Sequence, residues 1–186
     1  MRKTVRRSTT RPTERDLVRA TSAHLEVEGF RVRIDPDGTD YFDLVARRGD
    51  EVGLVEAKVG NARAVMLQAL KQRGWGDWTA VVLASATAAE RLAKRTSATR
   101  AEPVGVWSVS NGRVRVHRPA RRWVDPDGPD PFRALRERFR RLLDAIDAGE
   151  LPEGARWDGV THAVRRASGG RGFSEWRLDE PLPDER

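Results

Sequence analysis

The chain has 186 residues, of which 38% are hydrophobic and 34% charged, and its formal net charge is +7. This length accommodates one compact domain with an appendage, and no apolar run approaches the roughly 20 residues that span a bilayer. The chain contains no cysteine, which excludes disulfides and thiolate metal sites, and its basic start MRKTVRRSTTR lacks the apolar stretch of a secretory signal. We therefore expect a soluble, cytoplasmic protein with no membrane association.

The basic residues are almost all arginine. Of the 35 Lys and Arg residues, only Lys3, Lys58, Lys71 and Lys94 are lysine. A basic surface attracts polyanions, and nucleic acid is the commonest of them, although a compositional bias toward arginine explains the charge equally well. In such a chain, a lysine inside an apolar strand suggests a chemical role.

The first half of the chain predicts one helix and three strands. Residues 1–11 carry five cations and no acid, which is typical of a disordered basic arm. Thr13 followed by Asp16 forms a capping-box pattern that predicts the start of a helix, and Gly29 predicts its end. Strands are expected at 30–34, 41–47 and 52–59, separated by turns at 35–38 and 48–51.

The following residues predict alternating helices and strands. Gly60 and Asn61 introduce a helix that continues to about Gln72, and Asn111-Gly112 predicts a hairpin turn. The remaining expected elements are a strand at 80–84, a helix at 87–95, a strand at 104–109 and a last strand through Val114 and Val116. This order predicts an α/β domain with a mixed central β-sheet flanked by helices.

The composition changes after His117. Residues 119–131 form a proline-rich, charged connection, and apolar residues then recur at helical spacing over 132–147 among many arginines. A short helix is expected at 158–167. We therefore divide the chain into a basic arm (1–11), a core (12–118) and a helical, arginine-rich accessory segment (119–186).

The hairpin at 41–59 places charges within an apolar strand. If its turn is centred between Gly49 and Asp50, Asp43 faces Glu56 across the pair of strands. Because side chains alternate along a strand, Asp43, Glu56 and Lys58 then share one face. The other face is expected to pack against a helix through Phe42, Leu44, Val55, Ala57 and Val59.

Two carboxylates at such positions lie about 5 Å apart and repel each other, and desolvation adds to this cost. A divalent cation between Asp43 and Glu56 would relieve the repulsion, and Mg²⁺ needs few protein carboxylates because it retains water and binds phosphate oxygens. Lys58 would then orient a water molecule or stabilise negative charge. The alternative is a solvent-facing Glu–Lys pair, which is common on strands.

Asp43 followed by Glu56-Ala57-Lys58, between two helices, resembles the PD-(D/E)XK nuclease superfamily over about residues 12–85. The resemblance implies a restriction-endonuclease-like core with the order helix, three strands, helix, strand. It also implies that Asp43 and Glu56 bind Mg²⁺ or Mn²⁺ and that Lys58 assists the attacking water. In this family a first-helix glutamate and a glutamine of the following helix often join the site, which points to Glu14 and to Gln68, with Gln72 as second choice. The family's usual proline before the aspartate is replaced by Phe42.

The resemblance implies a metal-dependent endonuclease that hydrolyses phosphodiester bonds. DNA is favoured over RNA because the wider family mostly cuts DNA, and restriction, repair, junction resolution and phage defence all remain open. A homodimer would supply two sites for the two strands of a duplex. The alternatives are a non-catalytic nucleic-acid-binding protein of the same fold, or an interaction subunit whose helix at 132–147 docks an acidic partner.

Four arginines are candidates for binding the nucleic-acid backbone: Arg121, Arg122, Arg136 and Arg140. The alternative for them is a solvated face on a packed helix. Trp75 and Trp78 follow the second helix, and we expect them to cover the edge of the core rather than to stack on bases.

Overall fold

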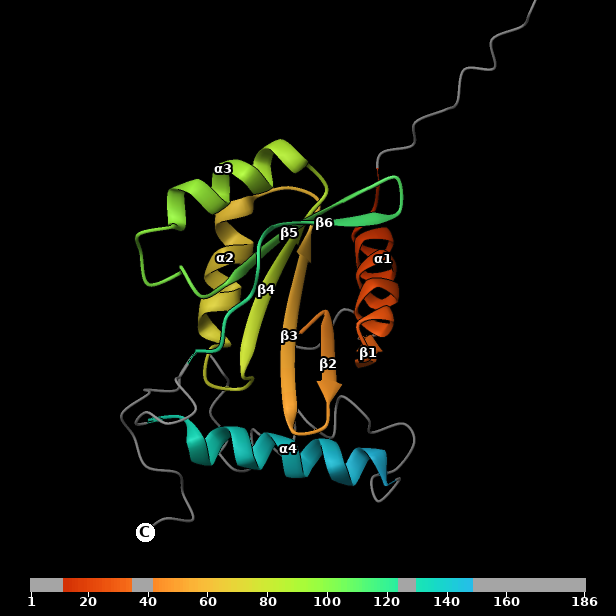
Figure 1. The fold of residues 1–186 in the computed structure, drawn as a ribbon, viewed down its shortest axis with the longest axis vertical. Helices are drawn as coiled ribbons and strands as arrows, with labels where there is room; N and C mark the ends of the chain where they lie inside the picture. The colour runs from red at the N-terminus through yellow and green to blue at the C-terminus, as the bar shows by residue number, and fades with distance from the viewer. Residues whose placement is uncertain (1–11, 35–41, 124–129, 149–186) are drawn as a thin grey trace, which may run out of the picture.

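A six-stranded mixed sheet with helices on both faces forms the centre of the molecule (Figure 1). The computed structural model describes residues 12–34, 42–123 and 130–148. Strands β1 to β3 are antiparallel, β3 to β5 are parallel, and β6 returns antiparallel to β5. The predicted mixed α/β architecture is thus confirmed. In spatial order, which is also chain order, the strands are β1 (Arg31–Ile34), β2 (Leu44–Arg48), β3 (Glu51–Lys58), β4 (Trp78–Leu83), β5 (Gly105–Ser110) and β6 (Arg113–Arg118).

One face of the sheet is covered by α1 (Glu14–Val27). The Thr13 hydroxyl accepts from the backbone N–H of Asp16, and the Asp16 carboxylate accepts from the backbone N–H of Thr13, so the predicted capping box is complete. The helix ends before Gly29, whose φ of 84° is accessible to glycine at little cost. Its buried residues Leu17, Val18 and Leu25 pack on the sheet.

The opposite face is covered by three helices. Helices α2 (Ala62–Lys71) and α3 (Ala86–Thr96) form the crossovers between the parallel strands. Helix α4 (Arg133–Asp147) runs across the lower end of the sheet in the view of Figure 1. None of the helices within the described residues is both long and apolar enough to cross a membrane.

The hairpin of β2 and β3 has the predicted register, with Val45 opposite Leu54 and Arg47 opposite Val52. Leu44, Val55 and Ala57 pack with α1 as expected. The prediction for Phe42 is wrong, because this side chain packs on the opposite face, in a cluster with Val45, Leu54 and Phe139. Strand β2 begins only at Leu44, so the alternation of a paired strand does not extend back to Phe42.

Helix α4 completes the core rather than standing apart from it. Leu135, Phe139 and Leu143 are buried against the hairpin and Trp75. The Asp77 carboxylate joins α4 to β3, because it accepts from Arg140 Nη2 at 2.7 Å and from the backbone N–H of Val52 at 2.8 Å. The predicted basic arm at 1–11 and the helix predicted at 158–167 lie outside the described residues.

Candidate active site

Four of the five predicted catalytic residues meet at the carboxyl end of β3. Glu56 and Lys58 lie on this strand, Asp43 directly precedes β2, and Glu14 is the first residue of α1. The antiparallel register of the hairpin brings Asp43 beside Glu56, as the sequence predicts. Glu14 arrives from the other face of the sheet, because the amino end of α1 lies next to the end of β3.

The two carboxyl groups are held by specific donors. Asp43 Oδ2 accepts from the backbone N–H of Ala57 at 2.6 Å, and Gln72 Nε2 donates to Glu56 Oε1. Glu56 is only 5% exposed, and its carboxyl group lies within hydrogen-bond contact of Asp43. Both acids are therefore fixed in place; Glu56 has little access to water, and Asp43 is half-buried.

This arrangement changes their protonation. Burial raises the pKa of Glu56 to about 8, and the negative charge of Asp43 adds to the effect. Burial also raises the pKa of Asp43, although the Ala57 N–H and the Lys58 ammonium oppose it. The raised pKa of Glu56 therefore favours its protonated form near neutral pH when no cation is bound.

Lys58 and Glu14 form the exposed rim of the site. Lys58 Nζ lies 3.4 Å from Glu14 Oε2, and the backbone N–H of Val59 donates to Glu14 Oε1 at 3.5 Å. The Lys58 side chain is 36% exposed and that of Glu14 is 48% exposed. An exposed ion pair of this kind contributes little to stability, so its effect is to place an ammonium group beside the acidic pair.

The donor set suits a hard divalent cation. Two carboxylates with restricted hydration repel each other, and a bound dication would compensate their negative charge. Among the residues that the structure describes, no three His, Asp or Glu side chains are grouped so that they could hold a metal. Asp43 and Glu56 would therefore leave most coordination positions to water and substrate oxygens, as Mg²⁺ commonly does.

The helix glutamine at this site is Gln72 and not Gln68. Gln72 is 5% exposed and bonds Glu56, whereas Gln68 is exposed on α2. The first-choice prediction of Gln68 therefore has to be corrected. The buried positions Val65, Met66 and Ala69 already mark the inner stripe of the helix, and Gln72 continues it at helical spacing.

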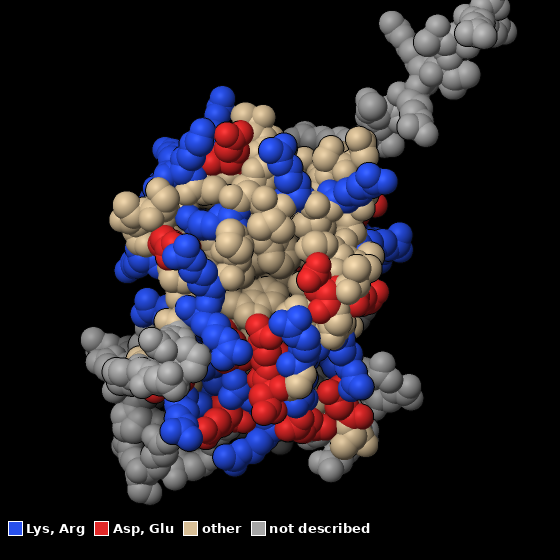
Figure 2. Space-filling view, in the orientation of Figure 1, with Lys and Arg blue, Asp and Glu red and all other residues tan. Residues whose placement is uncertain are grey.

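Only two of the four arginines predicted to bind the nucleic-acid backbone are exposed. Arg136 is 5% exposed and pairs with Asp130 and Asp77, and Arg140 pairs with Asp77, so both are engaged in holding α4 and their assignment is corrected. Arg121 pairs with Glu102 at 2.7 Å but stays exposed, and Arg122 is exposed. Figure 2 shows basic and acidic residues interleaved over the lower half of this face rather than a continuous basic stripe.

The two tryptophans behave as core residues. Trp75 is 6% exposed and meets Phe139 edge to face, with ring centroids 5.8 Å apart, and Trp78 is also 6% exposed. They cover the core, as predicted.

Comparison with known proteins adds no family assignment. No protein-family model matches the chain, and neither a curated protein nor a solved structure matches it. The geometry of the site and the order of the elements therefore carry the functional interpretation.

Proposed function

We propose that the protein is a metal-dependent nuclease that hydrolyses phosphodiester bonds, with a restriction-endonuclease-like core. The observation that carries this proposal is the contact between the buried carboxyl group of Glu56 and the half-buried carboxyl group of Asp43, beside the Lys58 ammonium. The element order α1-β1-β2-β3-α2-β4, which is that of the PD-(D/E)XK core, supports it. DNA is the preferred substrate on the strength of this resemblance alone.

Each residue has a distinct role in this proposal. Asp43 and Glu56 hold Mg²⁺ or Mn²⁺, which when bound polarises the phosphodiester and lowers the pKa of a coordinated water. The Ala57 N–H and the Gln72 amide fix the orientation of these two carboxylates. Lys58 stabilises negative charge at the scissile phosphate, and Glu14 positions its ammonium group.

The test is a cleavage assay with supercoiled plasmid, branched DNA, single-stranded DNA and RNA, each with Mg²⁺, Mn²⁺ or EDTA. We expect metal-dependent cutting that falls by about a hundredfold or more in Lys58→Ala and Glu56→Gln. Lys71→Ala is the matched lysine control, because Lys71 is exposed on α2, and Asp50→Asn is an acidic control in the exposed β2–β3 turn. Both controls should cut like the wild type.

Two results would count against the proposal. Cutting that persists in EDTA, or that Lys58→Ala and Glu56→Gln retain at the wild-type rate, would place the activity elsewhere or in a contaminant. Salt-sensitive binding of DNA without cutting under any metal would instead favour the non-catalytic nucleic-acid-binding protein.

A further inference from the structure

The positive charge of the protein is concentrated in one part of the fold. Residues 86–122, which include α3, β5 and β6, contain nine Lys or Arg residues and only two acidic residues. The other described residues contain fifteen Lys or Arg residues and thirteen acidic residues, so their charges nearly cancel. A general bias toward arginine would raise the charge of both parts and therefore does not explain the difference. In Figure 2 few acidic groups interrupt the basic ones in the upper part of the view, where α3 and β6 lie.

Four arginines of this part carry charge that the protein itself does not use. Within the described residues, all four are exposed and make no hydrogen bond or ion pair: Arg91 and Arg95 on α3, and Arg113 and Arg115 on β6. We call these four residues the α3–β6 basic surface. The two elements lie side by side: the hydrogen bond from Lys94 lowers the pKa of Glu90 on α3, and the charge of Arg115 on β6 lowers it further. Glu90 is the only acid on α3, so the surface remains strongly basic.

A further arginine, Arg118, fixes β6 against α3. Its guanidinium group donates to the backbone carbonyl oxygens of Ala93 at 3.2 Å, of Ala101 at 2.9 Å and of Val104 at 2.9 Å. These bonds join the strand to the helix and to the loop that follows the helix. The α3–β6 basic surface is therefore held in place before any partner binds.

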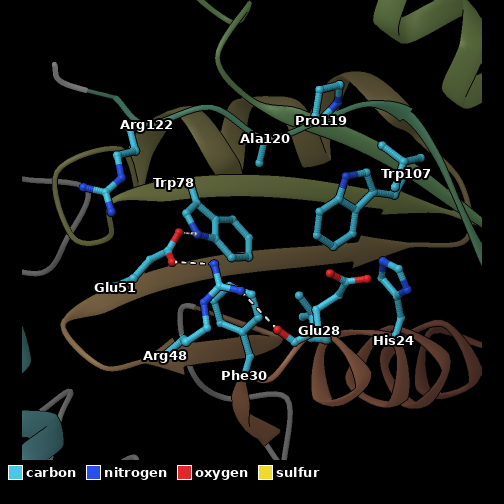
Figure 3. Close-up of a pocket in the computed structure, with 12 residues that line it drawn as sticks. His24, Glu28, Phe30, Arg48, Glu51, Trp78, Trp107, Pro119, Ala120 and Arg122 are labelled. Carbon is cyan, nitrogen blue, oxygen red and sulfur yellow. Dashed lines mark hydrogen bonds and ion pairs between the residues drawn. The ribbon is translucent and has the colours of Figure 1, made fainter. Parts of the chain in front are cut away.

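The four arginines lie outside the cavity on the α1 side of the sheet. This cavity of about 400 Å³ opens between α1 and the strands β3 to β6 (Figure 3), and its wall includes Trp78 and Trp107, each only 6% exposed. Charged groups at the cavity are partly engaged with each other, since Arg48 donates to Glu51 at 2.9 Å. Small molecules are usually bound in concave sites, whereas the exposed arginines of α3 and β6 suit an extended polyanion.

The α3–β6 basic surface lies within reach of the candidate active site. Backbone pairing defines one row of residues across the sheet, which runs from Lys58 on β3 through Leu83 and Ser108 to Arg115 on β6. Residues in such a row point to the same face of the sheet. The row crosses three strand spacings, so the backbone of Arg115 lies about 14 Å from that of Lys58. In Figure 1 the arrowhead of β3 points to the end of the molecule at which α3 and β6 lie.

We propose that the α3–β6 basic surface binds the phosphate backbone of double-stranded DNA beside the position of cleavage. An arginine side chain pairs with phosphate oxygens through two hydrogen bonds, and bound phosphates would offset the repulsion between Arg91 and Arg95, one helical turn apart. The distance of about 14 Å corresponds to about four base pairs of a duplex. The choice of DNA and the position of cleavage rest on the proposed function, whereas the location of the surface does not.

The placement of the aromatic residues favours a duplex over a single strand. Proteins that bind single strands stack the bases on aromatic side chains. Among the residues that the structure describes, no aromatic side chain is exposed. Contacts with the phosphate backbone are therefore the means of binding that this surface offers, and a duplex carries twice the charge of one strand per unit length.

The test measures binding of a fluorescent duplex of about 16 base pairs to the full chain by anisotropy, in EDTA so that no metal-dependent cutting occurs. We expect Arg113→Gln/Arg115→Gln to weaken binding about tenfold. The slope of log Kd against the logarithm of the salt concentration should fall by about 2, because two phosphate contacts are lost. Arg91→Gln/Arg95→Gln should have a similar effect. Because the two variants alter different elements, a folding defect in one of them does not decide the outcome.

Arg133→Gln/Arg141→Gln is the matched control. Both arginines are exposed on α4, at the opposite end of the sheet, and the variant loses the same two charges. It should bind the duplex within about twofold of the wild type, with an unchanged salt slope. A single-stranded oligonucleotide of the same length should bind the wild type more weakly than the duplex does.

Duplex binding that the two variants of the α3–β6 basic surface weaken, and the control does not, would support the proposal. An equal loss in all three variants would show that net charge rather than location matters, and would overturn it. Tighter binding of the single strand, equal competition by poly(glutamate), or no duplex binding by the wild type would also overturn it.

The two proposals can fail separately. Glu56→Gln should bind the duplex in EDTA like the wild type, although we expect it not to cut. Duplex binding through the surface without cutting under any metal would remove the nuclease proposal and leave the binding of the DNA backbone in place. Metal-dependent cutting together with unchanged duplex binding in Arg113→Gln/Arg115→Gln would do the reverse.

Discussion

Two clusters of charged side chains lie beneath helices on the same face of the sheet, and they differ in how far their opposite charges compensate each other. Under α4, the Asp77 carboxylate is met by two arginines, Arg136 and Arg140, and by the backbone N–H of Val52. Under α2, Asp43 and Glu56 face each other, and the cation beside them, Lys58, lies at the exposed rim. The first cluster is neutralised from within the protein, and the second is not.

The difference separates a structural cluster from the proposed metal site. The Asp77 cluster joins α4 to the hairpin, and its opposite charges compensate one another. A neutral pair of side chains would make the same contacts as the acidic pair. Burial of the acidic pair raises the pKa of Glu56 to about 8. Two acids whose proximity is unfavourable without an external cation support the proposal of a metal site.

Removing the acid of the balanced cluster should have the largest effect on stability. Asp77→Ala leaves the half-buried Arg140 guanidinium and the Val52 N–H without their acceptor and leaves the buried Arg136 with Asp130 alone, and we expect a loss of about 3–5 kcal/mol in the free energy of unfolding. Urea denaturation at pH 7 measures this value. Asp50→Ala, in an exposed turn, should change it by less than about 0.5 kcal/mol. A loss below about 1 kcal/mol for Asp77→Ala would mean that the cluster does not hold α4.

Neutralising Glu56, in the pair that it forms with Asp43, should raise the free energy of unfolding rather than lower it. Because the pKa of Glu56 is raised from 4.5 to about 8, the folded protein binds more protons than the unfolded chain between these values. The free energy of unfolding should therefore fall as the pH rises through this window. Glu56→Gln should lack this loss and exceed the wild type at pH 8.5 by an amount on the order of a few kcal/mol.

Urea denaturation of both proteins at pH 5 and pH 8.5, in EDTA, isolates the contribution of Glu56 together with its effect on Asp43, because the remaining titratable groups are shared. A difference between wild type and Glu56→Gln that does not grow with pH would show that Glu56 ionises normally in the folded protein.

A divalent cation should supply the positive charge that the pair of Asp43 and Glu56 lacks. At a concentration ten times its dissociation constant, Mg²⁺ should stabilise the wild type by about 1.4 kcal/mol, because it binds only the folded state. Thermal unfolding with increasing MgCl₂ at fixed ionic strength measures the shift. Asp43→Asn and Glu56→Gln should show no shift, whereas Asp50→Asn should respond like the wild type. An equal response in all four proteins would indicate binding elsewhere.

The smallest effect concerns the two glutamines of the second helix. Gln72→Ala removes the donor to Glu56 and should lower the free energy of unfolding by about 1 kcal/mol, whereas Gln68→Ala, on the exposed face, should stay within about 0.5 kcal/mol of the wild type. The same pair of variants in the cleavage assay should lower the rate only for Gln72→Ala. Equal behaviour of the two variants would contradict the placement of Gln72 at the site.

The sequence by itself determined the features that depend on neighbouring residues. The capping box of Thr13 and Asp16, the hairpin turn at Asn111-Gly112 and the register that places Asp43 beside Glu56 all follow from turn chemistry and from the alternation of side chains along a strand. These rules act over a few residues, so the order of the elements and the acidic pair could be predicted.

Only the tertiary structure decided which distant segments meet. It placed Phe42 on the opposite face from Leu44, because the strand begins after Phe42, and it engaged Arg136 with acids that lie outside its helix. It also gathered Phe30, Trp78 and Trp107 around one cavity, although they belong to different parts of the chain. Such contacts depend on how helices and strands pack against one another, and no local pattern of residue types specifies that packing.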